Sequence, residues 1–126
     1  MPTGVQDRDG PAANLIKEAA LPWILLITAG AFETLWAYHM KLSDGFSRPG
    51  ATIATFAAMA VSIGLLGLAM KSLPLGTAYM VWTGIGAVGA FVVGVVVLGE
   101  AITPLRLLAA ALIVAGIGLM KVSSPA

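Results

Sequence analysis

The chain has 126 residues, of which 59% are hydrophobic and only 10% are charged. A soluble domain would carry about 25% charged residues, so this composition indicates a protein whose solvent is lipid. The chain has no cysteine, which excludes disulfides, a thiolate nucleophile and cysteine metal sites. Its single histidine excludes histidine-cluster metal sites, and its net charge of +1 disfavours a nucleic-acid partner.

The first twenty residues differ in composition from the rest of the chain. They contain the helix breakers Pro2, Gly4, Gly10 and Pro11 and the charged residues Asp7, Arg8, Asp9, Lys17 and Glu18. We expect residues 1–20 to form a mobile polar tail with one helical turn near residues 15–20. A signal peptide is the competing interpretation, with residues 21–28 as its apolar core and 29–31 as its cleavage site. The tail lacks the positive charge of a signal peptide, which argues against it.

Four apolar stretches follow, over residues 21–40, 50–70, 75–98 and 104–120. Each approaches or exceeds the ~20 residues that a helix needs to cross the hydrocarbon core. Backbone in lipid must satisfy its own hydrogen bonds, so these stretches should be helices. The expected fold is an all-α membrane protein with four transmembrane helices over residues 21–124.

Glu33 is the only charged residue near the middle of a predicted span. An ionisable group at this depth is expensive and is a functional hypothesis by default. Burial favours the neutral form of a carboxyl group, so Glu33 can alternate between holding a proton and holding a cation. The simpler alternative is a protonated glutamate that bonds to a neighbouring helix.

The basic residues give the chain almost no preferred orientation in the membrane. Four would lie on the side of the N-terminus and three on the other, namely Arg8, Lys17, Lys71 and Lys121 against Lys41, Arg48 and Arg106. The positive-inside rule hardly distinguishes these numbers. A chain without bias can insert both ways and form an antiparallel pair. The alternative is that the two basic residues of the tail tip the balance or count for little.

A cation site can be assembled around Glu33 from hydroxyl donors and aromatic faces. Gly30 and Trp36 share the helical face of Glu33, and Tyr79 and Trp82 share a face of the third span. Ser62, near the middle of the second span, could donate a hydrogen bond to the carboxylate. Aromatic faces and a carboxylate suit a cation. Trp and Tyr also anchor spans at the interface, and a buried Ser often bonds its own backbone.

Two glycines lie near the centre of the third span, Gly84 and Gly86. They lower the stiffness of the helix and could form a hinge for alternating access. Close packing against a neighbouring helix is the alternative explanation.

The chain resembles the small multidrug resistance family over residues 21–124. The resemblance is carried by the segments Gly-Ala-Phe-Glu-Thr-Leu-Trp-Ala (30–37), Lys41 with Gly-Phe-Ser-Arg (45–48), Lys-Ser-Leu-Pro-Leu-Gly-Thr-Ala-Tyr (71–79) and Trp-Thr-Gly-Ile-Gly-Ala (82–87). Trp36 and the last segment look like the guanidinium-exporter subtype. The tail and His39 depart from the family pattern.

This resemblance implies an antiparallel homodimer in the bacterial inner membrane that exchanges protons for guanidinium, without a cofactor or metal. It implies that Glu33 binds substrate and proton, supported by Gly30, Trp36, Ser62, Tyr79 and Trp82. A broad exporter of quaternary ammonium and hydrophobic cations is the first alternative, and a non-transporting half of a heterodimeric pair is the second. An enzyme is not expected, because no nucleophile and base pair appears in the sequence.

Overall fold

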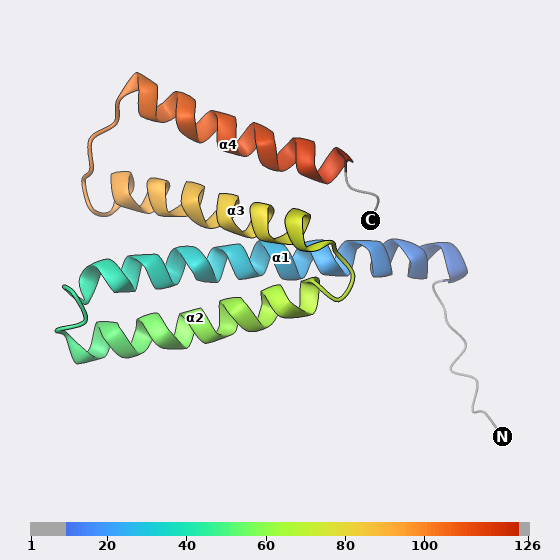
Figure 1. Cartoon of the computed structure of the whole chain (residues 1–126), viewed down its shortest axis with the longest axis horizontal. Coiled ribbons are helices and arrows are strands. Elements are labelled where there is room, and N and C mark those ends of the chain that lie inside the picture. Colours follow the sequence, from blue (N-terminus) through green and yellow to red (C-terminus); the bar gives the residue numbers. More distant parts are fainter. Residues whose placement is uncertain (1–9, 124–126) are drawn as a thin grey trace.

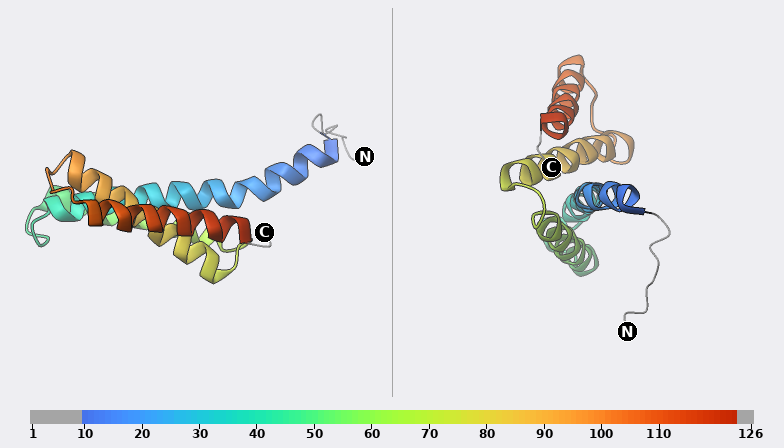
Figure 2. Two further views of the ribbon diagram at one scale, coloured as in Figure 1. Left: turned by 90° about the horizontal axis from the view of Figure 1, so that it is seen from above. Right: turned by 90° about the vertical axis from the view of Figure 1, so that its right-hand side faces the viewer.

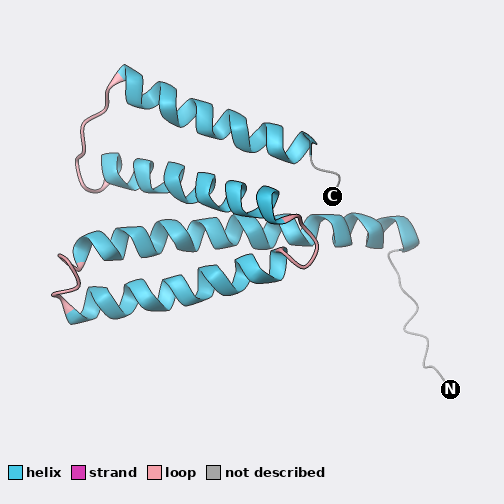
Figure 3. Cartoon of the chain, viewed as in Figure 1, coloured by secondary structure: helices cyan, strands magenta, loops and turns pink. Residues whose placement is uncertain are grey.

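The structure is a computed structural model, which describes residues 10–123. Four helices run up and down the molecule, joined by short loops (Figures 1 and 3): α1 Gly10–Leu42, α2 Pro49–Ala69, α3 Leu75–Val96 and α4 Pro104–Ser123. Proline marks the helix starts: Pro49 and Pro104 occupy the first position of α2 and α4, and Pro74 directly precedes α3. A proline there costs no hydrogen bond and has its φ preset for a helix.

All four helices are long and apolar enough to cross a membrane, which confirms the prediction of four helices of this kind. Their outer surfaces carry many exposed leucine, isoleucine, valine and phenylalanine side chains, as expected of a surface that meets lipid. The chain is therefore a multi-pass, all-α membrane protein.

The first helix begins earlier than the sequence indicated. We predicted one helical turn within residues 15–20, but α1 starts at Gly10 and continues without interruption to Leu42. Pro11 lies in the first turn of α1, where a proline is tolerated, so it starts the helix instead of breaking it. The predicted tail residues 1–9 lie outside the described residues.

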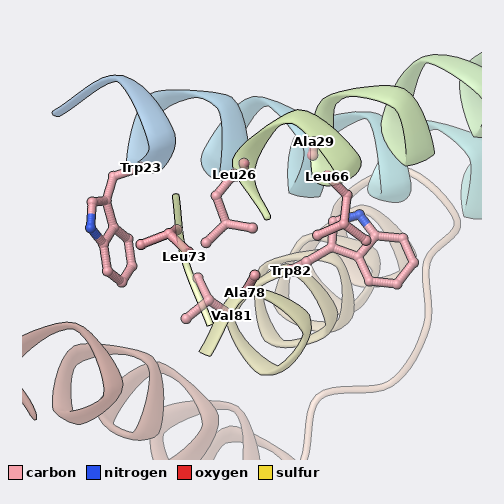
Figure 4. Close-up of a cluster of buried hydrophobic side chains, with 9 residues drawn as sticks. Trp23, Leu26, Ala29, Leu66, Leu73, Ala78, Val81 and Trp82 are labelled. Atoms are coloured by element: carbon pink, nitrogen blue, oxygen red, sulfur yellow. The ribbon is translucent and has the colours of Figure 1, made fainter. Parts of the chain in front are cut away.

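The helix α1 is central in the bundle. It packs against both α2 and α3, whereas α4 packs along α3 and has no buried residue (Figures 1 and 2). The helix α4 reaches α1 through Lys121, whose Nζ lies 5.2 Å from the ring centroid of Trp23. The apolar core lies where α1, α2 and α3 meet (Figure 4) and comprises Trp23, Leu26, Ala29, Leu66, Ala69, Leu73, Ala78, Val81 and Trp82. This core extends to the level of Trp82, next to the predicted cation site.

Candidate functional site

Glu33 lies on α1 where this helix faces α3. Its side chain is half-buried and packs against Gly86 of α3, so closely that a methyl group at position 86 would overlap the carboxylate. The oxygen Oε2 is buried and accepts no hydrogen bond from any described residue. It is the only such side-chain atom among residues 10–123. A buried, unpaired carboxylate oxygen is costly in any protein interior, so Oε2 of Glu33 requires a partner that the described residues of one protomer do not supply.

Ser62 connects three helices beside Glu33. Its hydroxyl donates to the carbonyl oxygen of Ala29 on α1 at 2.6 Å and accepts from the indole Nε1 of Trp82 on α3 at 2.9 Å. Ser62 is fully buried and Trp82 is 8% exposed. The sequence allows Ser62 to donate either to the Glu33 carboxylate or to the backbone of its own helix, and the structure shows neither bond. Its single proton is instead committed to Ala29, one helical turn away from Glu33.

Three aromatic side chains form a continuous row along the site. Trp36 meets Trp82 edge to face with ring centroids 5.9 Å apart, and the ring of Tyr79 is tilted against Trp82 with centroids 5.5 Å apart. Trp82 is buried at the centre of this row, while Tyr79 is half exposed. Trp82 is thus a core residue, which differs from the lipid-interface anchor that aromatic residues often provide. The structure therefore brings Trp36, Tyr79 and Trp82 together as predicted.

The predicted glycines lie at close helix–helix contacts. A side chain at Gly30 would collide with Ile85 of α3, and a side chain at Gly84 would collide with Ile117 of α4. The space beside Gly30 is occupied by Ile85. Gly84 and Gly86 both serve as contact points for neighbouring helices, and their use as a hinge stays a prediction.

Thr34 is a site residue that the sequence analysis overlooked. Its hydroxyl lies 3.3 Å from the carbonyl oxygen of Gly30 and 3.4 Å from that of Gly86, and its side chain packs directly against Gly89. It therefore holds α1 to α3 beside Glu33. The signal was available in the sequence as a hydroxyl adjacent to Glu33 and glycines three residues apart on the facing span, Gly86 and Gly89.

Charged groups other than Glu33 lie towards the helix ends. A cavity of about 150 Å³ between α1 and α3 is lined by Thr34, Tyr38, Lys41 and Glu100, among others. Glu100 is 3.9 Å from Arg106, and both are partly exposed. His39 contacts the carbonyl oxygen of Leu35 at 2.9 Å and the ring of Tyr38. Within residues 10–123, His, Asp and Glu nowhere gather in a group that could hold a metal ion.

Comparison with known proteins identifies close relatives. The family model described as Small Multidrug Resistance protein matches residues 21–113. The guanidinium exporter of Escherichia coli strain K12 is 54% identical over 104 residues, which is 82% of this chain and 99% of the relative. The guanidinium exporters of Citrobacter freundii and Salmonella typhimurium are 53% and 52% identical over the same lengths.

Proposed function

The chain belongs to the small multidrug resistance family, and on that premise we propose that it exports guanidinium and small guanidinyl cations in exchange for protons. It does so as an antiparallel homodimer in the bacterial inner membrane. The similar relatives are named guanidinium exporters and share more than half of their residues with this chain. The observation that carries the proposal is the buried Glu33 carboxylate oxygen, which has no partner among the described residues.

In this mechanism Glu33 binds either a proton or the substrate. Desolvation in the bundle penalises a bare carboxylate, so the carboxyl group releases its proton only when a cation can replace it. Two Glu33 side chains, one from each protomer, share a central cavity and disfavour each other's ionisation. Guanidinium is planar and offers paired N–H donors that suit carboxylate oxygens bidentately. Because proton and substrate exclude each other, inward proton flow drives export.

The residues around Glu33 shape the space into which the cation fits. Trp82 is fixed by its hydrogen bond to Ser62 and holds Trp36 and Tyr79 through ring contacts. Rings held in this way offer π faces to a guanidinium ion without reorganising when it arrives. Gly86 leaves the carboxylate room against α3. Thr34 holds α1 to the same part of α3.

Two features of a single protomer support the dimer. The helix α4 has no buried residue and is nevertheless strongly apolar, so an interaction with a second copy would give it a packed face. The nearly balanced distribution of Lys and Arg over the two sides of the membrane favours insertion in both orientations. Together they support antiparallel self-pairing.

Reconstituted vesicles test the proposed function directly. Purified protein in proteoliposomes should move guanidinium in the direction opposite to the proton flow that an imposed pH gradient drives. Glu33→Gln keeps the shape of the side chain and removes its exchangeable charge, so this variant should remain a folded dimer and lose gradient-driven transport. Gradient-driven transport in Glu33→Gln would refute the role of Glu33, and absence of guanidinium transport by the native protein would refute the substrate.

A further inference from the structure

The helix α1 is much longer than the other three. It has 33 residues against 20 to 22 in α2, α3 and α4. At 1.5 Å per residue α1 measures about 50 Å, whereas the hydrocarbon core is about 30 Å thick. The excess is at its N-terminal end, which extends beyond the rest of the bundle (Figures 1 and 2). The family match begins at residue 21, so Gly10–Ala20 lies outside it.

This N-terminal segment, Gly10–Ala20, is amphipathic. At 100° per residue one side of the helix carries Ala12, Leu15, Ile16 and Ala19, and the opposite side carries Asn14, Lys17 and Glu18. Leu15 and Ile16 are 66% and 69% exposed, which leaves the apolar side without a protein partner among the described residues. Large aliphatic side chains would not remain in water on a helix that is tethered to a membrane.

The helix contains a bend that can redirect the segment. Pro22 is buried inside α1 and cannot donate to the carbonyl oxygen of Glu18, so the helix is weakened at the base of the segment. The N-terminal part of α1 turns away from the bundle in the left view of Figure 2. Beneath it lies a cavity of about 610 Å³, with Leu25 and Leu68 among its apolar lining and Glu18 and Lys71 among its charged lining. A lining of both apolar and charged side chains suits an amphiphile such as a phospholipid.

We propose that Gly10–Ala20 is an interfacial helix that lies along the membrane surface, with the side of Ala12, Leu15, Ile16 and Ala19 immersed at the boundary of headgroups and acyl chains. The partner is the lipid surface itself. The charges of Lys17 and Glu18 cancel within the segment, so apolar burial drives the interaction and zwitterionic lipid is sufficient. The segment thereby fixes the depth of α1, and with it the depth of Glu33.

Single-cysteine labelling of the full chain tests the proposal, because the chain contains no cysteine of its own. Leu15→Cys and Ile16→Cys report on the apolar side, and Asn14→Cys and Lys17→Cys are matched controls at the same distance from the bundle. Each variant is labelled with an environment-sensitive fluorophore and reconstituted in phosphatidylcholine vesicles. Quenching by spin-labelled lipid should be strong at positions 15 and 16, and quenching by aqueous iodide should be strong at 14 and 17.

Two results would overturn the proposal. Equal iodide quenching at all four positions would mean that the segment projects into water. Protection of position 15 from both quenchers, together with a disulfide that joins two protomers of the unlabelled Leu15→Cys variant, would mean that a second copy covers the apolar side. Pro22→Ala restores the missing hydrogen bond and should lower lipid quenching at position 16. Unchanged quenching in that variant would show that the bend at Pro22 does not place the segment.

Discussion

Gly86→Ala is the smallest change that acts directly on the Glu33 carboxylate. The added methyl group would occupy the position of Oε2 and Cδ of Glu33 and would come within 2.8 Å of its Cγ. Glu33 must therefore leave its present rotamer, or α1 must move away from α3. Either change moves the carboxylate away from its present position against Gly86.

The expected effect on folding is modest. Overpacking a filled site costs about 1–3 kcal/mol, whereas alanine in place of glycine within a helix returns about 1 kcal/mol. The net destabilisation should then be about 0–2 kcal/mol from these two contributions. The effect on transport should be much larger, because the displaced atoms are those that we propose to bind proton and substrate. A displacement of about 1 Å at a reacting group can cost about 100-fold in rate.

Two measurements separate these effects in Gly86→Ala. Unfolding in a mixed-detergent titration gives the change in stability, and guanidinium flux into proteoliposomes gives the change in function. Gly67→Ala is the matched control, because position 67 is also a helical glycine but has no heavy atom within 4 Å of the added carbon in the protomer. We expect Gly67→Ala to retain transport and Gly86→Ala to lose most of it at similar stability. Native flux in Gly86→Ala would refute the packing of Glu33 against α3.

The remaining predictions concern the hydrogen bond, the selectivity and the topology. Ser62→Ala leaves the Trp82 N–H unpaired, whereas Ser62→Ala with Trp82→Phe removes both partners. Unfolding of the two single variants and the double variant should give a coupling energy of about 0.6 kcal/mol and at most about 1.7 kcal/mol. Additive losses of stability would show that the hydrogen bond contributes nothing. The native protein should transport tetrapropylammonium poorly, because this ion has no N–H to donate, and Trp36→Gly should admit it. Transport of tetrapropylammonium and guanidinium at similar rates by the native protein would favour the broad drug exporter. Reporter tags at the C-terminus should appear on both sides of the membrane. Two lysines added to the loop at 43–48 should shift the tags to one side. A single orientation of the native chain would contradict the antiparallel homodimer.

The number and positions of the helices could be predicted because each depends on local composition. A run of about twenty apolar residues is long enough to span, and the breaks at Pro49, Pro74 and Pro104 fall at helix starts in the structure. The start of α1 was mispredicted since Gly10 and Pro11 were interpreted only as breakers. Proline at the first turn of a helix has the opposite meaning.

The sequence identified most residues of the candidate site but not which atoms they contact. Glu33 was identifiable because a charge within a span is rare, and the helical spacing of Tyr79 and Trp82 placed them on one face. The partner of Ser62 depends on how α2 is rotated against α1 and α3, which a sequence pattern does not determine. The overlooked contact of Thr34 with α3 depends on how α1 is rotated against α3.

The pattern of satisfied and unsatisfied polar groups bears on how transport can be coupled. Ser62, Trp82 and Thr34 have their hydrogen-bonding groups engaged by other parts of the protomer. The Glu33 oxygen Oε2 is the one buried side-chain atom among residues 10–123 that has no partner. A proton or cation can therefore bind at Glu33 without breaking the Ser62–Trp82 hydrogen bond. In the proposed mechanism these hydrogen bonds stay intact while proton and cation compete for Glu33, and an empty, ionised Glu33 is the state that burial disfavours most.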